Sequence, residues 1–233
     1  SFALASGEFA ALIGPNGAGK STLFGLLSGQ HRPTRGAVRF GGQRIDTRGA
    51  AARAQAGIGR TFQTAQAFGT LSVRENLQLA LAACAGRVRD PWTPMRALYG
   101  DEADALLAQV GLADRAARAA ADLPYPDTKR LELAIALAGS PRLLLMDEPT
   151  AGMAAAERFA LMDLVRQVAA DGALTVLFTE HSMEVVFGYA QRGLVMAGGA
   201  LMADGARDQV RRDPAAQAAY FGAAESDAAE PAR

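Results

Sequence analysis

The chain has 233 residues, half of them apolar, which is enough for one sizeable core or for a core with a subdomain. Lys and Arg number 24, as do Asp and Glu, so the zero net charge excludes an electrostatic attraction to nucleic acid or to a bare anionic membrane. The single cysteine, Cys84, excludes an internal disulfide and indicates a reducing, cytoplasmic environment, where we expect a small buried residue rather than a reactive thiol. No apolar run approaches the roughly 18 residues that cross a bilayer, so we do not expect a transmembrane channel.

The first predicted element is a strand from Phe9 to Ile13, followed by a glycine-rich loop and a helix from about Gly19 to Ser28. Glycines let such a loop turn tightly and aim successive N–H groups at phosphates, and the helix start adds a positive dipole end. Lys20 would neutralise the β- and γ-phosphates, and the Ser21 hydroxyl would bind Mg²⁺. A chance glycine-rich turn is the alternative, but the strand–loop–helix context favours a nucleoside triphosphate site. The loop fits G-x-x-x-x-G-K-[ST] and consists of Gly14, Pro15, Asn16, Gly17, Ala18, Gly19, Lys20, Ser21 and Thr22.

A hairpin is predicted next, from Ala37 to Phe40 and from Gln43 to Ile45, with a glycine turn between the two strands. It would form a small antiparallel flank. The segment Arg60-Thr61-Phe62-Gln63 then leads into a mostly helical stretch. The Gln63 amide could contact both Mg²⁺ and a water molecule, although an ordinary loop glutamine is the alternative.

The helical stretch predicts a subdomain of residues 66–140 inserted into a core made of residues 1–65 and 141–222. Residues 223–233 are small and polar, which predicts a disordered tail. The helices expected within the stretch are Val73 to Ala83, Asp101 to Val110 with Asp101 as its N-cap, and Lys129 to Ala138.

The core resumes with the apolar strand Leu143 to Met146, which ends in Asp147 and Glu148. Asp147 would hold Mg²⁺ through water, and Glu148 would polarise the attacking water. Two acids with two roles indicate hydrolysis. The alternative is a strand capped by solvated charges.

A helix from about Ala155 to Ala170 and a strand from Leu174 to Phe178 complete a βαβ crossover. The strand runs into Thr179-Glu180-His181, which places His181 at the carboxyl edge of a parallel sheet, within reach of a γ-phosphate. A surface histidine without a task is the alternative. The alternation of strands and helices predicts an α/β fold with a parallel sheet, which ends in a late hairpin of Leu194 to Met196 and Leu201 to Ala203.

The order of these features resembles the ATP-binding subunit of an ABC transporter. The resemblance implies a P-loop NTPase core with an inserted helical subdomain, spanning residues 1–233 as one ATP-binding domain that lacks the family's first strand and its adenine-stacking aromatic residue. Within the family, the chain is similar to the branched-chain amino-acid importer branch in the segments Arg60-Thr61-Phe62-Gln63, Asn76-Leu77, Tyr125, Lys129-Arg130-Leu131-Glu132, Asp147-Glu148-Pro149-Thr150-Ala151-Gly152, Glu180-His181-Ser182-Met183, Ala203-Asp204-Gly205 and Tyr220-Phe221-Gly222.

The resemblance also implies partners and a place in the cell. Two ATPase subunits would close around two ATP molecules, with Mg²⁺, and drive transmembrane permease subunits that import a branched-chain amino acid, urea or a small amide. The chain would lie in the cytoplasm at the inner face of the plasma membrane and contact the membrane only through the permease. No nucleic-acid partner is implied.

One segment departs from the family. The signature Leu-Ser-Gly-Gly-Gln, which serves the opposite subunit's ATP, aligns with Leu123-Pro124-Tyr125-Pro126-Asp127. Pro124 has no hydroxyl, neither proline has an N–H, and Asp127 adds a negative charge. This predicts an asymmetric heterodimer in which the partner's site turns over slowly, or a nucleotide-binding subunit with impaired hydrolysis; alternatively, Asp127 caps a helix that begins near Thr128. Met153-Ala154-Ala155 is a second departure, which predicts altered communication between the two sites.

Overall fold

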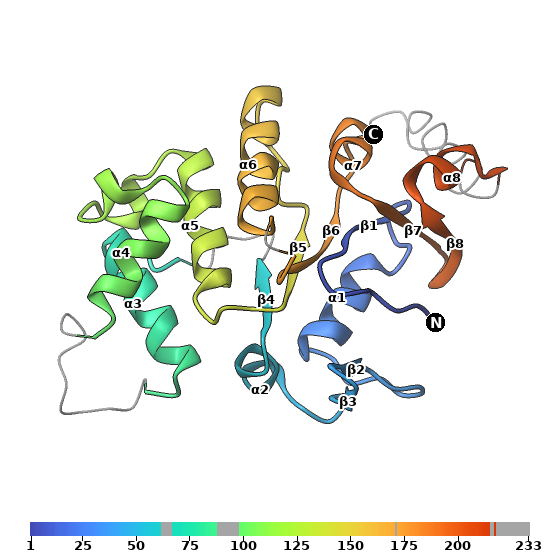
Figure 1. Cartoon of the computed structure of the whole chain (residues 1–233), viewed down its shortest axis with the longest axis horizontal. Coiled ribbons are helices and arrows are strands. Elements are labelled where there is room, and N and C mark those ends of the chain that lie inside the picture. Colours follow the sequence, from blue (N-terminus) through green and yellow to red (C-terminus); the bar gives the residue numbers. More distant parts are fainter. Residues whose placement is uncertain (62–66, 88–97, 171, 215–216, 218–233) are drawn as a thin grey trace, which may run out of the picture.

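The computed structural model describes residues 1–61, 67–87, 98–170, 172–214 and 217. Gln63 and the predicted disordered tail, residues 223–233, lie outside the described residues. Within them, six strands form one sheet in the order β4-β5-β6-β1-β7-β8, which is parallel except for the antiparallel pair β7–β8 (Figure 1). The predicted α/β fold is confirmed. The strands are β1 (Phe9–Ile13), β4 (Ile58–Thr61), β5 (Leu143–Asp147), β6 (Thr175–Thr179), β7 (Arg192–Ala197) and β8 (Ala200–Ala206).

The central strands are short apolar runs because both faces of the sheet are covered. Every residue of β1, β5 and β6 is buried. Side chains alternate between the faces: Ala10 and Leu12 of β1 join one core cluster, while Phe9, Ala11 and Ile13 join the other. Since β1, β5 and β6 run parallel, their carboxyl ends meet at the same edge of the sheet.

Helix α1 (Lys20–Ser28) packs its Phe24 into the first of these clusters, and α6 (Ala155–Val168) and α7 (Met183–Tyr189) pack into the second, on the opposite face. The predicted hairpin is present, in shorter form, as β2 (Arg39–Phe40) and β3 (Gln43–Arg44). The late hairpin is present as β7 and β8. Strand β4, helix α7 and two short helices, α2 (Ala50–Gln55) and α8 (Arg207–Arg212), were not predicted from the sequence.

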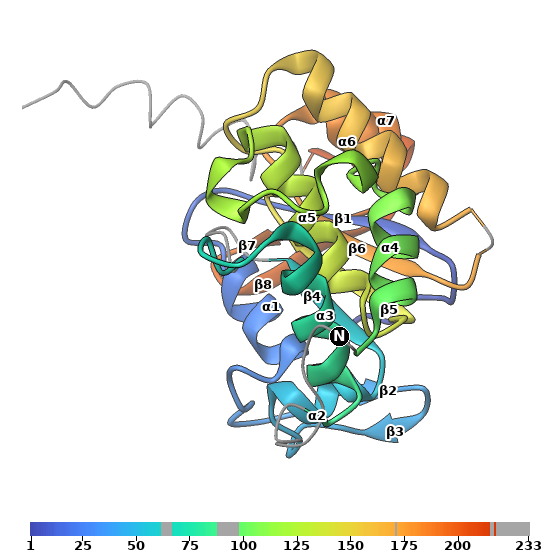
Figure 2. The ribbon, with the colours of Figure 1, turned by 90° about the vertical axis from the view of Figure 1, so that its left-hand side faces the viewer.

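The chain between the neighbouring strands β4 and β5 is helical: α3 (Val73–Cys84), α4 (Gly100–Gln109) and α5 (Tyr125–Leu137), with the 3₁₀ turns η2 (Ala113–Arg115) and η3 (Ala120–Asp122). In Figure 1 these helices lie beyond β4, at the end of the sheet away from β7 and β8, and Figure 2 views the molecule from that side. Their treatment as a subdomain of residues 66–140 remains a prediction.

Two predicted helix starts are wrong. Asp101 does not cap α4: the N-cap is Tyr99, with φ 57°, and Asp101 lies in the first turn. Helix α5 begins at Tyr125, four residues before the predicted Lys129, because Pro126 fits the first turn, where a helix leaves N–H groups unpaired anyway. Cys84, at the end of α3, is half-buried, and burial raises the pKa of its thiol, as expected of an unreactive cysteine. In the described ranges, no helix combines the length and apolar character needed to cross a bilayer.

Candidate nucleotide site

The glycine-rich loop leaves β1 at the carboxyl edge of the sheet and enters α1. A Cβ on Gly14 would lie 2.0 Å from the Met196 carbonyl oxygen, so this position has no room for a side chain. Gly17 and Gly19 have φ of 75° and 96°, in the left-handed region that favours glycine, and Gly19 is the N-cap of α1. The loop thus folds as a backbone cradle, the geometry expected for phosphate binding.

Lys20, the first residue of α1, is only 8% exposed. Its Nζ donates to the carbonyl oxygens of Gly14 (2.6 Å) and Pro15 (3.1 Å), so the ammonium group lies across the loop. Burial lowers the pKa of Lys20, and the charges of Glu148 and Asp147 oppose this shift. Because β1, β5 and β6 are parallel, the loop that follows β1 and the two acids at the end of β5 lie at the same edge of the sheet. Ser21 and Thr22 follow in the first turn of α1 and are exposed.

Asp147 ends β5, and Thr179 ends the neighbouring strand β6. The Thr179 hydroxyl donates to Asp147 Oδ1 at 2.9 Å, and the backbone N–H of Glu148 donates to Thr179 Oγ1 at 3.0 Å. Glu148 has φ 49°, an uncommon conformation for a residue with a side chain. The threonine therefore fixes the position of both acids at the sheet edge.

His181 lies beside Glu148, with Nε2 2.9 Å from Oε1 of the carboxylate. Its side chain is 47% exposed and that of Glu148 is 23% exposed, so both groups remain accessible from solvent. The structure therefore brings Lys20, Asp147, Glu148 and His181 together, although they are far apart in sequence. Their chemical roles remain predictions, as does that of Gln63, which lies outside the described residues.

Arg60 is a member of this site that the sequence analysis did not single out for a role. It lies in β4, next to β5, and its NH2 is 3.3 Å from Asp147 Oδ2. Its NH1 donates to Ser28 Oγ (2.8 Å) and Gln30 Oε1 (2.7 Å), at the end of α1. Burial lowers the pKa of the guanidinium, and the adjacent Asp147 charge opposes this shift. The sequence offered no usable signal for this role, because the strand that buries Arg60 was itself not predicted.

Glu180 is the second such residue. It is 5% exposed, and its Oε1 accepts hydrogen bonds from Thr150 Oγ1 (2.5 Å) and from the Thr150 backbone N–H (3.0 Å). Because Thr150 follows Glu148 by two residues and Glu180 precedes His181, this contact ties together the two segments that carry the acid and the histidine.

The segment Leu123 to Asp127 forms the start of α5. Pro124 is the N-cap, and its carbonyl oxygen accepts the N–H of Asp127 at 3.0 Å. The expectation that Asp127 caps a helix beginning near Thr128 is wrong, because Asp127 is the third residue of the helix. Its carboxylate forms an ion pair with Arg115, which offsets the negative charge that we had expected it to contribute.

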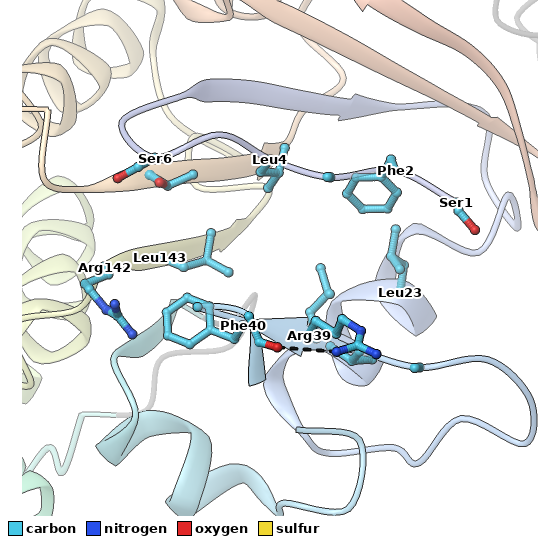
Figure 3. Close-up of a pocket in the computed structure, with 16 residues that line it drawn as sticks. Ser1, Phe2, Leu4, Ser6, Leu23, Arg39, Phe40, Arg142 and Leu143 are labelled. Atoms are coloured by element: carbon cyan, nitrogen blue, oxygen red, sulfur yellow. Dashed lines mark hydrogen bonds between the residues drawn. The ribbon is translucent and has the colours of Figure 1, made fainter. Parts of the chain in front are cut away.

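A separate cavity of about 680 Å³ lies between residues 1–6, the β2–β3 hairpin and α1 (Figure 3). Phe2, Leu23 and Phe40 line it, and the Arg142 guanidinium stacks 4.8 Å from the centre of the Phe40 ring. Leu143 and Thr175, which begin β5 and β6, also line it. The cavity therefore lies toward the amino edge of the sheet, away from the cradle, and contributes nothing to the phosphate site.

The residues at the carboxyl edge fit a nucleoside triphosphate with its metal. The backbone cradle and Lys20 supply N–H groups and a positive charge for phosphates, and the Ser21 hydroxyl with the Asp147 carboxylate supply oxygen ligands of the kind that Mg²⁺ prefers. A doubly covered parallel sheet with this cradle and these acids defines a P-loop nucleotide-binding protein.

Comparisons with known proteins identify the family within this class. Residues 1–151 match the ABC transporter family, and the chain belongs to it. The branched-chain amino acid transport ATP-binding protein LivG of Escherichia coli (strain K12) is 34% identical over 224 residues, covering 93% of this chain and 88% of LivG. The corresponding protein BraF of Pseudomonas aeruginosa is 34% identical over 229 residues, with the same shares of each chain. The resemblance to the ATP-binding subunits of ABC transporters and to this importer branch is confirmed.

Solved structures agree with this assignment. A nucleotide-free ATP-binding cassette from an ABC transporter has a TM-score of 0.81 and 28% identity, covering 93% of this chain and 88% of that one. The ADP conformation of the cassette MJ1267 has a TM-score of 0.81 and 30% identity, covering 93% and 89%. The predicted ABC ATPase fold and ATPase class are confirmed, and these relatives do not favour the alternative of impaired hydrolysis.

Proposed function

We propose that this chain hydrolyses ATP with Mg²⁺ to power the import of a branched-chain amino acid or a similar polar nitrogenous solute. The observation that carries the proposal is the 2.9 Å contact between Glu148 and His181 beside the buried Lys20. A carboxylate such as Glu148, in contact with a histidine beside a phosphate-binding loop, can activate a water molecule for attack on the terminal phosphate. The names of LivG and BraF support the solute class.

Each residue receives one role. Lys20 and the loop N–H groups bind the β- and γ-phosphates, Glu148 orients the attacking water, and His181 contacts the γ-phosphate. Bound Mg²⁺ would neutralise charge that develops on the phosphates. Ser21, Asp147 through water, and Gln63 are its proposed ligands.

The proposed assembly contains a second ABC ATPase subunit and permease subunits. In it the chain lies at the cytoplasmic face of the plasma membrane and contacts the membrane only through the permease. The two prolines at the start of α5 favour an asymmetric pair, in which this chain's own cradle is active and the partner's site is slow.

Glu148→Gln tests the proposal because glutamine keeps the size of the side chain and removes its charge. We expect ATP turnover of the assembled transporter to fall about 10²- to 10⁴-fold, the usual contribution of a general base. Thermal stabilisation of the chain by ATP with Mg²⁺ should persist. Glu102→Gln, at an exposed acid in the first turn of α4, is the matched control and should leave turnover unchanged.

Three results would contradict the proposal. A Glu148→Gln variant with wild-type turnover would remove the assigned base. A wild-type chain that ATP and Mg²⁺ do not stabilise would remove the nucleotide site itself. Failure to co-purify with any membrane subunit, in cells that co-express candidate permease subunits, would argue against transport.

A further inference from the structure

Asp147 is a buried carboxylate whose two oxygens are both engaged. Its side chain is 6% exposed; Thr179 donates to Oδ1, and the Arg60 guanidinium lies 3.3 Å from Oδ2. Among the described residues, Arg60 is the cation paired with Asp147. The two contacts differ in kind: the neutral hydroxyl orients the carboxylate, and the guanidinium compensates its charge.

The need for compensation is considerable here. Glu148 adds a second negative charge directly after Asp147, and Lys20 is hydrogen-bonded to the carbonyls of its own loop. The Arg60 side chain is itself only 10% exposed, and its NH1 donates hydrogen bonds to the Ser28 hydroxyl and the Gln30 side-chain oxygen. Removing one member of a buried ion pair leaves the other as an uncompensated charge, which is strongly unfavourable.

We propose that Arg60 is a resident counter-charge for Asp147, which stabilises the metal-free site and competes electrostatically with Mg²⁺. This inference rests on the proposed function. Arg60 acts on the site only through its charge beside Asp147, so it is not a catalytic residue. Since Thr179 also holds Asp147, the carboxylate keeps its orientation without Arg60 and loses only the opposing charge. The apparent affinity for Mg²⁺ should then rise when Arg60 is neutralised.

The rival explanation is a mechanical one. Arg60 also links β4 to the end of α1 through its hydrogen bonds. A purely structural link (a strut) would stabilise the fold equally with and without bound ligand. Ser28→Ala removes one of these connections and leaves the charge at Asp147 untouched. It is therefore the matched control for Arg60→Met, and Arg60→Lys tests whether charge alone is sufficient.

The experiment follows thermal unfolding of the purified full chain in ATP with EDTA and across a titration of Mg²⁺ at saturating ATP. For Arg60→Met we expect the Mg²⁺ concentration at half-maximal stabilisation to fall about tenfold. The reason is that the variant removes one positive charge that opposes Mg²⁺ at Asp147. Its loss in melting temperature should be largest in EDTA. Arg60→Lys should keep a midpoint near that of the wild type, and Ser28→Ala should lower the melting temperature equally in both states with an unchanged midpoint.

Two outcomes would overturn the inference: an unchanged Mg²⁺ midpoint in Arg60→Met, which indicates a strut, or a raised midpoint, which indicates that Arg60 orients Asp147 for the metal. If Arg60→Met does not fold, Asp147→Asn and the double variant provide the test. A counter-charge role requires Arg60→Met to raise the melting temperature of Asp147→Asn in EDTA, because it removes a buried positive charge that no longer faces a carboxylate. Absence of any ATP response in the wild-type chain would instead contradict the proposed function.

Discussion

Two helix starts in this chain are expected to face ATP, and they are built in opposite ways. Helix α1 begins after a left-handed glycine and places the buried Lys20 over a backbone cradle. Helix α5 begins with Pro124 and Pro126, which have no N–H, and with Asp127, whose N–H is bonded to the Pro124 carbonyl. The N-terminus of α1 therefore offers a positive charge and N–H donors, whereas the N-terminus of α5 offers few N–H donors.

The difference separates the two half-sites that one chain contributes. In the proposed assembly, the half built on α1 serves this chain's own nucleotide; Thr179 bonds to both acids there, and Glu148 contacts His181. The half built on α5 serves the nucleotide of the other subunit in the proposed assembly. A defect at α5 would therefore appear in the partner's turnover, while nucleotide binding at α1 stays intact.

The largest expected effect concerns how firmly α5 is held. Lys129 Nζ and Glu132 Oε2 form an ion pair at 3.0 Å, and each side chain is only 6% exposed. Lys129→Met should lower the free energy of unfolding by about 3–5 kcal/mol at pH 7, because Glu132 is left buried and unpaired. Denaturant titration measures this. A loss below about 1 kcal/mol would show that α5 is loosely anchored and would weaken the comparison with α1.

The pH dependence of that variant has a definite sign. Burial raises the pKa of Glu132, and the bond to Lys129 and its charge oppose this shift, so Lys129→Met should raise the pKa further. An acid with a raised pKa in the folded state destabilises the fold when ionised, so the deficit should shrink as the pH falls through that pKa. The control is Lys129→Met with Glu132→Leu, which removes both charges and should restore stability to about the wild-type level.

The next effect concerns the cradle at α1. Gly14→Ala would place a Cβ 2.0 Å from the Met196 carbonyl oxygen, at a position with φ 154°. Overpacking of this kind costs about 1–3 kcal/mol, which corresponds to a loss of about ten- to a hundredfold in ATP affinity if the loop must shift. Equilibrium binding of a fluorescent ATP analogue measures it.

The control for this prediction is Gly17→Ala in the same loop. A Cβ on Gly17 meets nothing within 4 Å, so only the positive φ of 75° is strained there. We expect a smaller loss of affinity than for Gly14→Ala. Equal losses would show that the strained backbone conformation, rather than the clash with Met196, causes the loss of ATP affinity.

The sequence predicted the nucleotide half of the molecule well because its signals are local. Apolar runs predicted β1, β5 and β6 to within about one residue at each end, and the spacing from Gly14 to Thr22 located the cradle. Asp147 ends a buried strand, and Glu148 and His181 follow buried strands by one and two residues, so parallel pairing brings them to one edge. These features depend on neighbours in the chain, which a sequence displays.

What the sequence did not reveal depends on tertiary partners. Strand β4 was missed because Ile58–Thr61 contains a glycine and an arginine, and its place beside β5 makes it a strand. The role of Arg60 follows from its distance to Asp147, 87 positions away. The alternative in which Asp127 caps a helix is wrong, and its pairing with Arg115 and the earlier helix start could not be read from local spacing.

The smallest expected effect concerns the donor-poor start of α5. Pro126→Gly restores an N–H at the second position of the helix, where it can point toward a bound phosphate. We expect the ATP turnover of the assembled transporter to rise severalfold. Stability should fall slightly, by about 1 kcal/mol, because glycine replaces a residue that suits the first turn.

Pro126→Ala distinguishes the missing donor from chain flexibility, because alanine also restores the N–H but favours the helix. Both variants should raise turnover if the donor is what α5 lacks, whereas glycine alone should do so if mobility is limiting. Unchanged turnover in both would mean that the prolines do not slow the partner's site. The two helix starts would then differ in structure without differing in function, and the proposed asymmetry would be wrong even though the cradle at α1 remained a nucleotide site.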